Sequence, residues 1–405
     1  MTESSATAAS KVGAPETARI GLLEIAPPEI ALYVHWPYCA RICPYCDFNV
    51  VRDRGRRGEA AALARAILAD LAAQAELAGR RRLVSIFFGG GTPSLMEPDW
   101  AAGVIETARR LFVPAPDLEV TLEANPTDAE AARFAAFREA GVTRLSLGVQ
   151  SLDDSALAFL GRNHDAAAAR RAAEVARATF PRLSLDLIYA LPGQTVAAWE
   201  TDLAAALALG PEHISAYQLT IEPGTPFARA VARGRWTPPG EDVAASLYEA
   251  TDRVLSAGGL FAYEVSNHAR SLAARSRHNL IYWRGGDYLG IGPGAHGRLT
   301  ADGARWATLT PRRVAEYVAR LDATGDSLLE RTRLAPREAA LERLLMGLRT
   351  VEGVALAELA DLAPDPESIQ RMTRAGLLEP AEGRLIVTRR GRAVLDRITL
   401  ELAAS

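Results

Sequence analysis

The chain has three cysteines, and all of them lie in one short run: Cys39, Cys43 and Cys46, with the spacing C-x3-C-x2-C. Thiolates are the ligands that iron–sulfur clusters select. Three thiolates at this spacing can hold three irons of one 4Fe–4S cubane and leave the fourth iron open. An open iron on a low-potential cluster is what reductive cleavage of S-adenosylmethionine requires. The run therefore predicts a 4Fe–4S site of this kind.

Two other interpretations of the run stay open. A structural zinc site has four Cys or His ligands, and His35 lies close enough in sequence to complete a Cys3His set. A redox pair of the C-x-x-C type would use Cys43 and Cys46 but leave Cys39 without a role. The lack of any other cysteine favours the cluster, because structural zinc usually draws a second ligand pair from well downstream.

The composition excludes several other classes of function. With 405 residues, 49% of them hydrophobic, the chain is long enough for two or three domains. Its net charge of −3 gives no bias toward nucleic acid, and Lys11 is the only lysine, so the folded region has no P-loop lysine or lysine base. The sequence shows neither a signal peptide nor an apolar stretch of the roughly 18–20 residues that span a membrane. We therefore expect a reducing, cytoplasmic location.

Strand and helix patterns alternate along the first half of the chain. We expect strands at 31–36, 83–88, 118–123, 144–149, 183–189 and 213–219. We expect helices at 58–79, 98–111, 127–141, 153–160, 165–179 and 195–210. Thr127 with Glu130 has the pattern of a capping box, and Thr195 that of an N-cap. Six consecutive βα units predict a parallel sheet with outer helices.

The pattern changes after residue 223, and we expect four regions in all. They are a flexible tail (1–29), a barrel (30–223), an extension of the barrel (224–330) and a C-terminal module (331–405). The extension contains helices at 242–257 and 311–323, an extended run at 261–265 and a linker at 325–334. The module has the outline of a small winged-helix-like α+β fold. Its arginines and acidic residues are nearly balanced, so no nucleic-acid partner is expected.

Chemistry-bearing residues recur where the expected barrel strands end. They are Gly90, Gly91, Thr92, Glu123, Gln150, Arg162 and Asp186. The glycines lack a Cβ and so permit close approach of a small polar ligand. Because the carboxyl ends of parallel strands meet at one edge, the carboxylate, amide and guanidinium groups can bind one ligand together. Taken singly, each is as open to a capping or surface role.

The run from His278 to Trp283, His-Asn-Leu-Ile-Tyr-Trp, is the second informative segment. An imidazole beside two aromatic rings can ligate iron and stack on a macrocycle. The same residues also suit a hydrogen-bonded core position. The residues themselves leave both roles open.

Together these motifs resemble the radical S-adenosylmethionine superfamily and, within it, the HemN/HemW group. The likeness covers about residues 30–390 and includes the segments 33–46, 89–93, 148–150 and 186–194. It implies a partial (β/α)6 barrel that carries the cluster, followed by the C-terminal module. It also implies that S-adenosylmethionine is bound at matching positions: Tyr33, Tyr45, Gly90, Gly91, Thr92, Glu123, Gln150, Arg162 and Asp186.

Two branches of this group differ in their motifs. Oxygen-independent coproporphyrinogen III dehydrogenases carry a further cysteine where this chain has Phe48. Heme-chaperone members carry a His-Asn-x-x-Tyr-Trp motif linked to heme, present here as His278, Asn279, Tyr282 and Trp283. The resemblance therefore implies a heme chaperone that binds heme, the cluster and S-adenosylmethionine and delivers heme to acceptor proteins.

The alternative is an enzyme of the dehydrogenase branch, which would carry out radical oxidative decarboxylation of the propionates of coproporphyrinogen III. Radical chemistry would also require a low-potential electron donor. The position of Phe48 argues against this branch without excluding it, since a cluster needs only three cysteines. A regulatory protein that uses the winged module on DNA is a third class, disfavoured by the neutral charge of the module.

Overall fold

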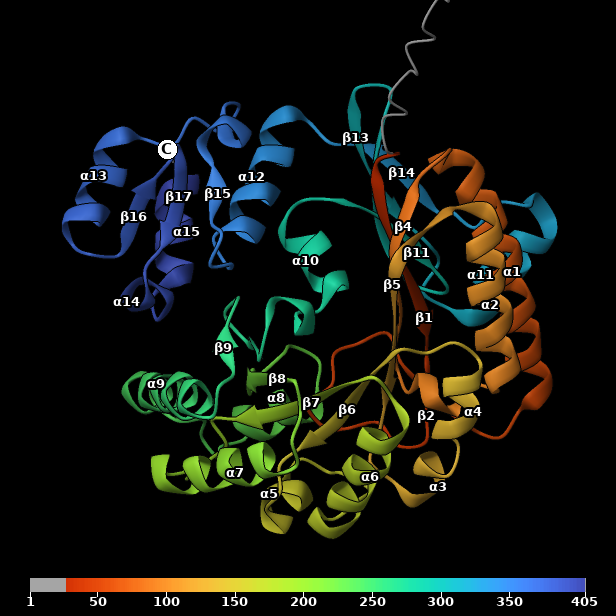
Figure 1. The fold of residues 1–405 in the computed structure, drawn as a ribbon, viewed down its shortest axis with the longest axis horizontal. Helices are drawn as coiled ribbons and strands as arrows, with labels where there is room; N and C mark the ends of the chain where they lie inside the picture. Colours follow the sequence, from red (N-terminus) through yellow and green to blue (C-terminus); the bar gives the residue numbers. More distant parts are fainter. Residues whose placement is uncertain (1–26, 405) are drawn as a thin grey trace, which may run out of the picture.

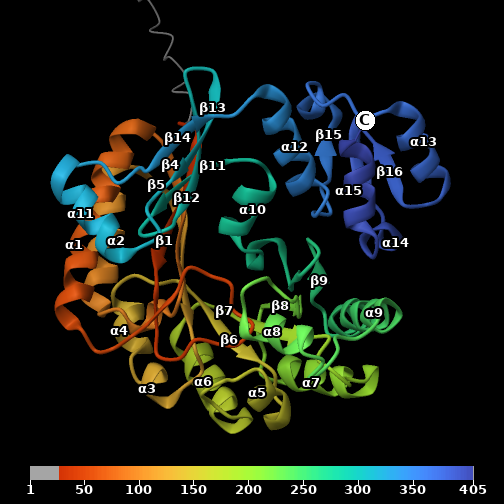
Figure 2. The same ribbon diagram turned by 180° about the vertical axis from the view of Figure 1, so that it is seen from behind.

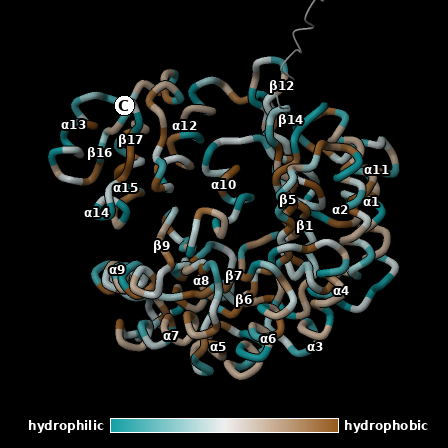
Figure 3. Tube along the Cα trace, viewed as in Figure 1, coloured by the Kyte–Doolittle hydropathy of each residue, from teal (hydrophilic) through white to brown (hydrophobic). Residues whose placement is uncertain are grey.

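A computed structural model describes residues 27–404 of the chain. Of the expected tail, residues 1–26 lie outside the described residues, and the first strand already begins at Glu29. The described part is a curved sheet with helices on its outer face and a smaller module opposite its open side (Figure 1 and Figure 2). Hydrophobic segments are concentrated along the strands of the sheet (Figure 3).

All six expected barrel strands are confirmed. They are β1 (Glu29–Trp36), β4 (Arg82–Gly90), β5 (Val113–Ala124), β6 (Arg144–Gln150), β7 (Arg182–Tyr189) and β8 (His213–Gln218). They pair in chain order, and every pairing is parallel. The helices that follow them are α1 (Arg57–Ala78), α2 (Pro98–Leu111), α3 (Asp128–Ala131), α4 (Phe134–Glu139), α5 (Asp154–Phe159), α6 (Ala166–Thr179) and α7 (Val196–Ala208). The chain therefore forms the expected partial barrel of six βα units.

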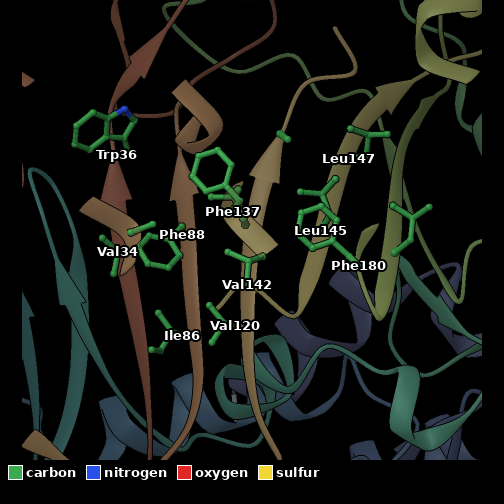
Figure 4. Packing of buried hydrophobic residues seen from close by; sticks show 14 of the residues in the cluster. Val34, Trp36, Ile86, Phe88, Val120, Phe137, Val142, Leu145, Leu147 and Phe180 are labelled. Carbon is green, nitrogen blue, oxygen red and sulfur yellow. The ribbon is translucent and has the colours of Figure 1, made fainter. Parts of the chain in front are cut away.

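The main core lies between the strands and the outer helices. Val34, Phe88, Val120 and Leu145 stand on four neighbouring strands, are fully buried and point to the helix side (Figure 4). Burial of each such side chain contributes about 1.5–3 kcal/mol to stability. Because this core fixes the positions and the register of the strands, it also fixes where their carboxyl ends lie.

The sheet continues beyond the barrel at both edges. β11 (Asp287–Ile291) adds in parallel to β1, and β12 (His296–Ala301), β13 (Ala304–Leu309) and β14 (Glu330–Arg333) follow antiparallel. At the other edge β10 (Asn267–Ala269) and β9 (Phe261–Ala262) follow β8. In the described part of the chain the sheet has 12 strands. Of the added strands only β9, which covers the first two residues of the expected extended run at 261–265, was indicated by the sequence.

The expectation of a plain linker at 325–334 is wrong for its second half, which is β14. All four residues of β14 are exposed, and the strand lies at the edge of the sheet. Charged residues are common on edge strands, where they discourage pairing with other chains, so the sequence of this strand has the polarity of a loop. The expected helix at 311–323 is α11, which runs from Val314 to Thr324.

The segment with the His-Asn-x-x-Tyr-Trp motif forms a short helix, α10 (Arg277–Trp283), capped by the side chain of Ser276. Figure 1 and Figure 2 show α10 on the open side of the sheet, between the sheet and the C-terminal module. Two further helices, α8 (Pro226–Ala232) and α9 (Glu241–Ala257), precede it. No helix within residues 27–404 is both long and apolar enough to cross a membrane.

The C-terminal module has a hydrophobic core of its own. Its elements are α12 (Pro336–Gly347), β15 (Val354–Ala355), α13 (Pro366–Arg374), β16 (Leu378–Ala381), β17 (Arg384–Val387), α14 (Arg389–Arg392) and α15 (Leu395–Ala403). The β16–β17 hairpin corresponds to the wing of the expected winged-helix-like outline, and β15 adds a third strand to it. The expected small α+β module is therefore present.

Candidate functional site

The carboxyl ends of the barrel strands open into one cavity of about 1200 Å³. This is the end of a parallel barrel where functional residues collect, because the loops that follow the strands converge there. All seven strand-end residues singled out in the sequence line this cavity: Gly90, Gly91, Thr92, Glu123, Gln150, Arg162 and Asp186. The structure thus brings together residues that lie far apart in the chain.

Cys39, Cys43 and Cys46 line the same cavity. Cys39 ends the short strand β2 (Tyr38–Cys39), which pairs with β3 (Val51–Arg52) and so closes the cysteine loop at its base. All three thiols are free. Burial raises the pKa of Cys39 to about 11, so this thiol requires a bound cation to ionise at neutral pH. Three free thiols on one wall, one of them deeply buried, fit an iron–sulfur cluster.

A zinc site that uses His35 does not fit this structure. The imidazole Nδ1 of His35 hydrogen bonds to the Tyr33 hydroxyl at 3.0 Å, and Nε2 to the backbone carbonyl of Asn49 at 2.8 Å. Within residues 27–404 no three His, Cys, Asp or Glu side chains are placed to hold a single metal ion. His35 instead supports the site from behind, where its ring fills the space that a Cβ on Gly90 would occupy.

The Gly-Gly-Gly-Thr turn after β4 packs tightly against the cysteine loop. Gly90 has φ 111°, and a Cβ on Gly91 would come within 2.7 Å of the carbonyl oxygens of Pro37 and Tyr38. The amide of Thr92 donates to the Tyr38 carbonyl at 2.8 Å. The turn therefore requires glycine for close packing against the His35 ring and the backbone of the cysteine loop.

Arg162 is the central hydrogen-bond donor of the site. Its guanidinium contacts the Sγ of Cys43 at 3.2 Å, the Tyr45 hydroxyl at 3.4 Å and the Gly148 carbonyl at 3.0 Å. It also donates to Oδ1 of Asn125 at 2.5 Å, and the amide nitrogen of Asn125 in turn donates to Thr92 at 3.0 Å. One side chain thus joins the cysteine loop to the ends of β5 and β6.

Two buried carboxyl groups face the cavity from β5 and β7. Burial, and then the neighbouring Asp186, raises the pKa of Glu123 to about 8. Burial raises the pKa of Asp186 to about 6, although Ser146 donates to it at 2.9 Å. A carboxyl pair of this kind can bind an ammonium group or sugar hydroxyls, because a positive ligand relieves the cost of burying the charge.

Gln150 lines the cavity in a strained backbone conformation, with φ 66°. It lies where the pairing of β6 with β7 shifts register. Such a conformation in a residue other than glycine costs about 1–3 kcal/mol and is common at ligand sites. Tyr45 also lines the cavity, whereas Tyr33 lies behind it and contacts His35.

The four residues of the aromatic motif do not meet at the cavity wall. His278 is 1% exposed and hydrogen bonds to Ser85 at 3.1 Å and to Tyr282 at 2.6 Å. Burial lowers its pKa to about 3, and its ring stacks on Phe87 at 4.8 Å. Of the motif residues, Asn279 lines the cavity. His278 therefore occupies the core position that the sequence left open beside the iron-ligand role.

Several residues of the cavity wall escaped the sequence analysis. Asn125 directly follows β5, so its position at a strand end could have been noticed. Arg349, Arg392 and Arg397 reach the cavity from the C-terminal module, and no local pattern indicates that placement. The placement of these arginines depends on how the module packs against the barrel.

Comparisons with known proteins agree with this geometry. Residues 33–206 match the model of the Radical SAM superfamily, the class that the barrel and its three thiols define. Residues 334–394 match the model of the HemN C-terminal domain. The heme chaperone HemW of Mycobacterium tuberculosis is 38% identical over 94% of this chain and 97% of its own length. The chain belongs to the HemN/HemW group of the radical S-adenosylmethionine superfamily.

The chain is also similar to a mitochondrial protein and to a solved structure of the same fold. The bovine protein called radical S-adenosyl methionine domain-containing protein 1, mitochondrial, is 42% identical over 92% of this chain and 87% of its own length. The solved structure of coproporphyrinogen III oxidase (HemN) from Escherichia coli superimposes with a TM-score of 0.77. It covers 93% of this chain and 90% of that one at 22% identity, so this likeness concerns the fold.

Proposed function

We propose that the chain is a heme chaperone, which binds heme, a 4Fe–4S cluster and S-adenosylmethionine and delivers heme to acceptor proteins. The observation that carries this proposal is the similarity, over 94% of the chain, to a protein named as a heme chaperone. Phe48 gives further support, because the dehydrogenase branch has its additional cysteine at this position. Its side chain is 64% exposed beside the cysteine loop.

We propose Cys39, Cys43 and Cys46 as the cluster ligands. When bound, such a cluster supplies an open iron for the amino-acid end of S-adenosylmethionine and, once reduced, an electron. The chain's own residues would then position that cofactor. Backbone around Gly90 and Gly91 offers a surface without side chains, and Glu123 and Asp186 offer carboxylates to ammonium or hydroxyl groups. We place the remaining cofactor contacts at Tyr45, Thr92, Gln150 and Arg162. Tyr33, which the resemblance also assigned to the cofactor, would act from behind the cavity through His35.

We propose the motif of His278, Asn279, Tyr282 and Trp283 as the part of the chain linked to heme. Asn279 already lies at the cavity wall. For His278 to ligate heme iron, its ring would have to leave the hydrogen bonds to Ser85 and Tyr282. Direct contact by Asn279, with His278 and Tyr282 holding α10 in place, requires no such rearrangement.

The proposed partners are heme, heme-accepting proteins and, where the cluster is reduced, a low-potential electron donor. Exposed arginines lie on and after β3, the strand that pairs with the cysteine-bearing β2. They are Arg52, Arg54 and Arg57, whereas the neighbouring Arg56 is paired with Glu59. Positive charge that is unpaired within the described residues, so close to the cluster ligands, suits an acidic electron-transfer protein. The free thiols support a reducing, cytoplasmic compartment.

A hemin titration of the anaerobically reconstituted protein, followed by Soret absorbance, tests this function. We expect saturable binding of stoichiometric hemin by the wild type and weaker binding by Asn279→Ala. We choose Asn279→Ala because the Asn279 side chain makes no hydrogen bond to any other residue of 27–404, so its removal should not disturb the fold. Absence of saturable binding to the wild type would overturn the proposal and direct attention to decarboxylation of coproporphyrinogen III.

A further inference from the structure

The cavity is larger than one cofactor requires. Sites for a single small molecule commonly measure about 300–1,000 Å³, whereas this cavity holds about 1200 Å³. The thiols and strand-end residues line one part of it. A second part, which we call the distal part, lies between β8, α9 and the C-terminal module. It is lined by Tyr217, Tyr248, Val265, Arg392, Val394 and Arg397.

The arginines of the cavity wall fall into two kinds. Arg144 is 1% exposed and pairs with Glu119 at 2.9 Å, and both terminal nitrogens of Arg162 are hydrogen bonded as described. The guanidinium groups of Arg392 and Arg397 have no hydrogen bond or ion pair with any other residue of 27–404. A cation on a cavity wall is stabilised by a neighbouring anion. Because neither guanidinium has such a partner within the described part of the chain, the two arginines indicate a ligand that carries negative charge.

The acidic residues near the distal part are stabilised by helix N-termini and not by the two arginines. Glu241 and Asp242 lie in the first turn of α9, and Asp396 lies in the first turn of α15. Negative charge in this position is stabilised by the helix dipole, and all three side chains are exposed. They do not pair with Arg392 or Arg397.

The rest of the distal part is apolar and aromatic. Tyr217 and Val394 are each 43% exposed and face the cavity, an unusual exposure for side chains of this size. Tyrosine rings and aliphatic side chains suit a flat, apolar ring system, which stacks on them. Arginine suits carboxylates, because its planar fork donates two parallel hydrogen bonds to one group.

We propose that the distal part binds the tetrapyrrole and that Arg392 and Arg397 bind its carboxylate groups. This inference rests on the proposed function, since it takes heme as the ligand, and it adds the residues that hold the propionates. It also assigns a task to the C-terminal module: the module supplies the anion-binding side of a site whose aromatic side comes from β8 and α9.

Arg349 links this site to the aromatic motif. Its guanidinium lies over the ring of Trp283 at 4.8 Å and pairs with the fully buried Glu264 at 3.3 Å. Arg349 also lines the cavity. Trp283 therefore acts on the distal part as a positioning residue, through Arg349, rather than by contact with the ring.

The test compares the affinities of the protein for hemin and for hemin dimethyl ester, in which both carboxylates are masked. A contact to a carboxylate affects the affinity for hemin alone, whereas any other contact affects both affinities. Arg392→Gln and Arg397→Gln are compared with Arg390→Gln, a control on the same helix as Arg392 whose side chain is exposed and outside the cavity wall. We expect each cavity variant to bind hemin about tenfold more weakly and the control to bind it as the wild type does. For the ester, all four proteins should show the same affinity.

Equal hemin affinity for the variants and wild type would overturn the inference, as would an equal loss for hemin and for the ester. Neither result would affect the proposed function, because the wild type would still bind hemin. Conversely, a wild type that binds no hemin refutes the proposed function itself. Iron content and S-adenosylmethionine affinity at wild-type level in the variants show that each one is folded.

Discussion

Arg162 donates a hydrogen bond to the Sγ of Cys43 over 3.2 Å, although 119 positions separate the two residues in the chain. The same guanidinium donates to the carbonyl of Gly148 at 3.0 Å, at the end of β6. The loop that carries the thiols is therefore tied to the barrel by a side chain as well as by its own strand. This arrangement makes the geometry of the thiols sensitive to a single distant residue.

We expect Arg162→Lys to weaken S-adenosylmethionine binding about tenfold, because a single ammonium cannot reproduce a planar fork with several acceptors. Isothermal titration of the reconstituted protein measures this loss. Arg171→Lys is the matched control, since that arginine pairs with Asp128 on the surface, where both side chains are more than half exposed. Wild-type affinity in Arg162→Lys would contradict the role assigned to this residue.

Each of Cys39→Ser, Cys43→Ser and Cys46→Ser should lose nearly all of its iron and sulfide after anaerobic reconstitution. A serine hydroxyl does not ionise near neutral pH, so two thiolates would be left to hold the cluster. Phe48→Cys serves as a control that adds a thiol beside the same loop. It should keep the iron content of the wild type, and full iron content in any of the serine variants would refute the assignment.

The contribution of Glu123 to the stability of the cofactor-free protein should fall as the pH rises from about 5 to 8. The pKa of this carboxyl is raised from 4.5 to about 8, chiefly by burial and then by Asp186. In this interval the unfolded carboxyl has lost its proton while the folded one retains it, so the part of the free energy of unfolding that comes from this group falls as pH rises. Glu123→Gln carries no such proton, and its stability relative to the wild type should increase by about 3 kcal/mol across the interval.

Urea unfolding of the cofactor-free protein at several pH values measures this difference. Glu106→Gln, on the exposed face of α2, should give a pH profile parallel to that of the wild type. A Glu123→Gln profile that is also parallel would show that Glu123 is ionised in the folded protein at pH 5.

His278→Ala should lower the free energy of unfolding by about 3 kcal/mol, because it leaves a cavity and deprives Ser85 and Tyr282 of their hydrogen-bond partner. His296→Ala, an exposed histidine on β12, should change it by less than about 0.5 kcal/mol. Equal stability of the two variants would show that His278 is not the core residue described above.

The barrel was largely predictable because its strands are mostly buried and its helices have recognisable start signals, although the single helix expected at 127–141 is divided into α3 and α4. Thr127, for example, accepts a hydrogen bond from the amide of Glu130, as the capping pattern indicated. Most of the extra strands were not predictable in this way. β10 is only three residues long, and β14 is exposed and charged. Local sequence holds too little information about such strands, which depend on their neighbours.

The cavity was predictable where its residues end parallel strands. Glu123 and Asp186 face it because β5 and β7 run the same way and end at the same edge. His278 shows the limit of the same reasoning: its neighbouring residues favour a core position, whereas the family motif favours a contact with heme. Arg392 shows another limit, since its place on the wall depends on how two separately packed cores meet.

The Asn49 side chain has a consequence for how the protein is made. Its Nδ2 donates to the carbonyls of Pro293 and Arg312, each at 2.9 Å, across 244 and 263 positions of sequence. The anchors of the cysteine loop are therefore translated at least 244 residues after the loop itself. During that interval a nascent chain has its thiols without the support that holds the loop. Cluster assembly onto a settled loop must wait until both anchors have been made, and the cell must keep three unprotected thiols reduced until then.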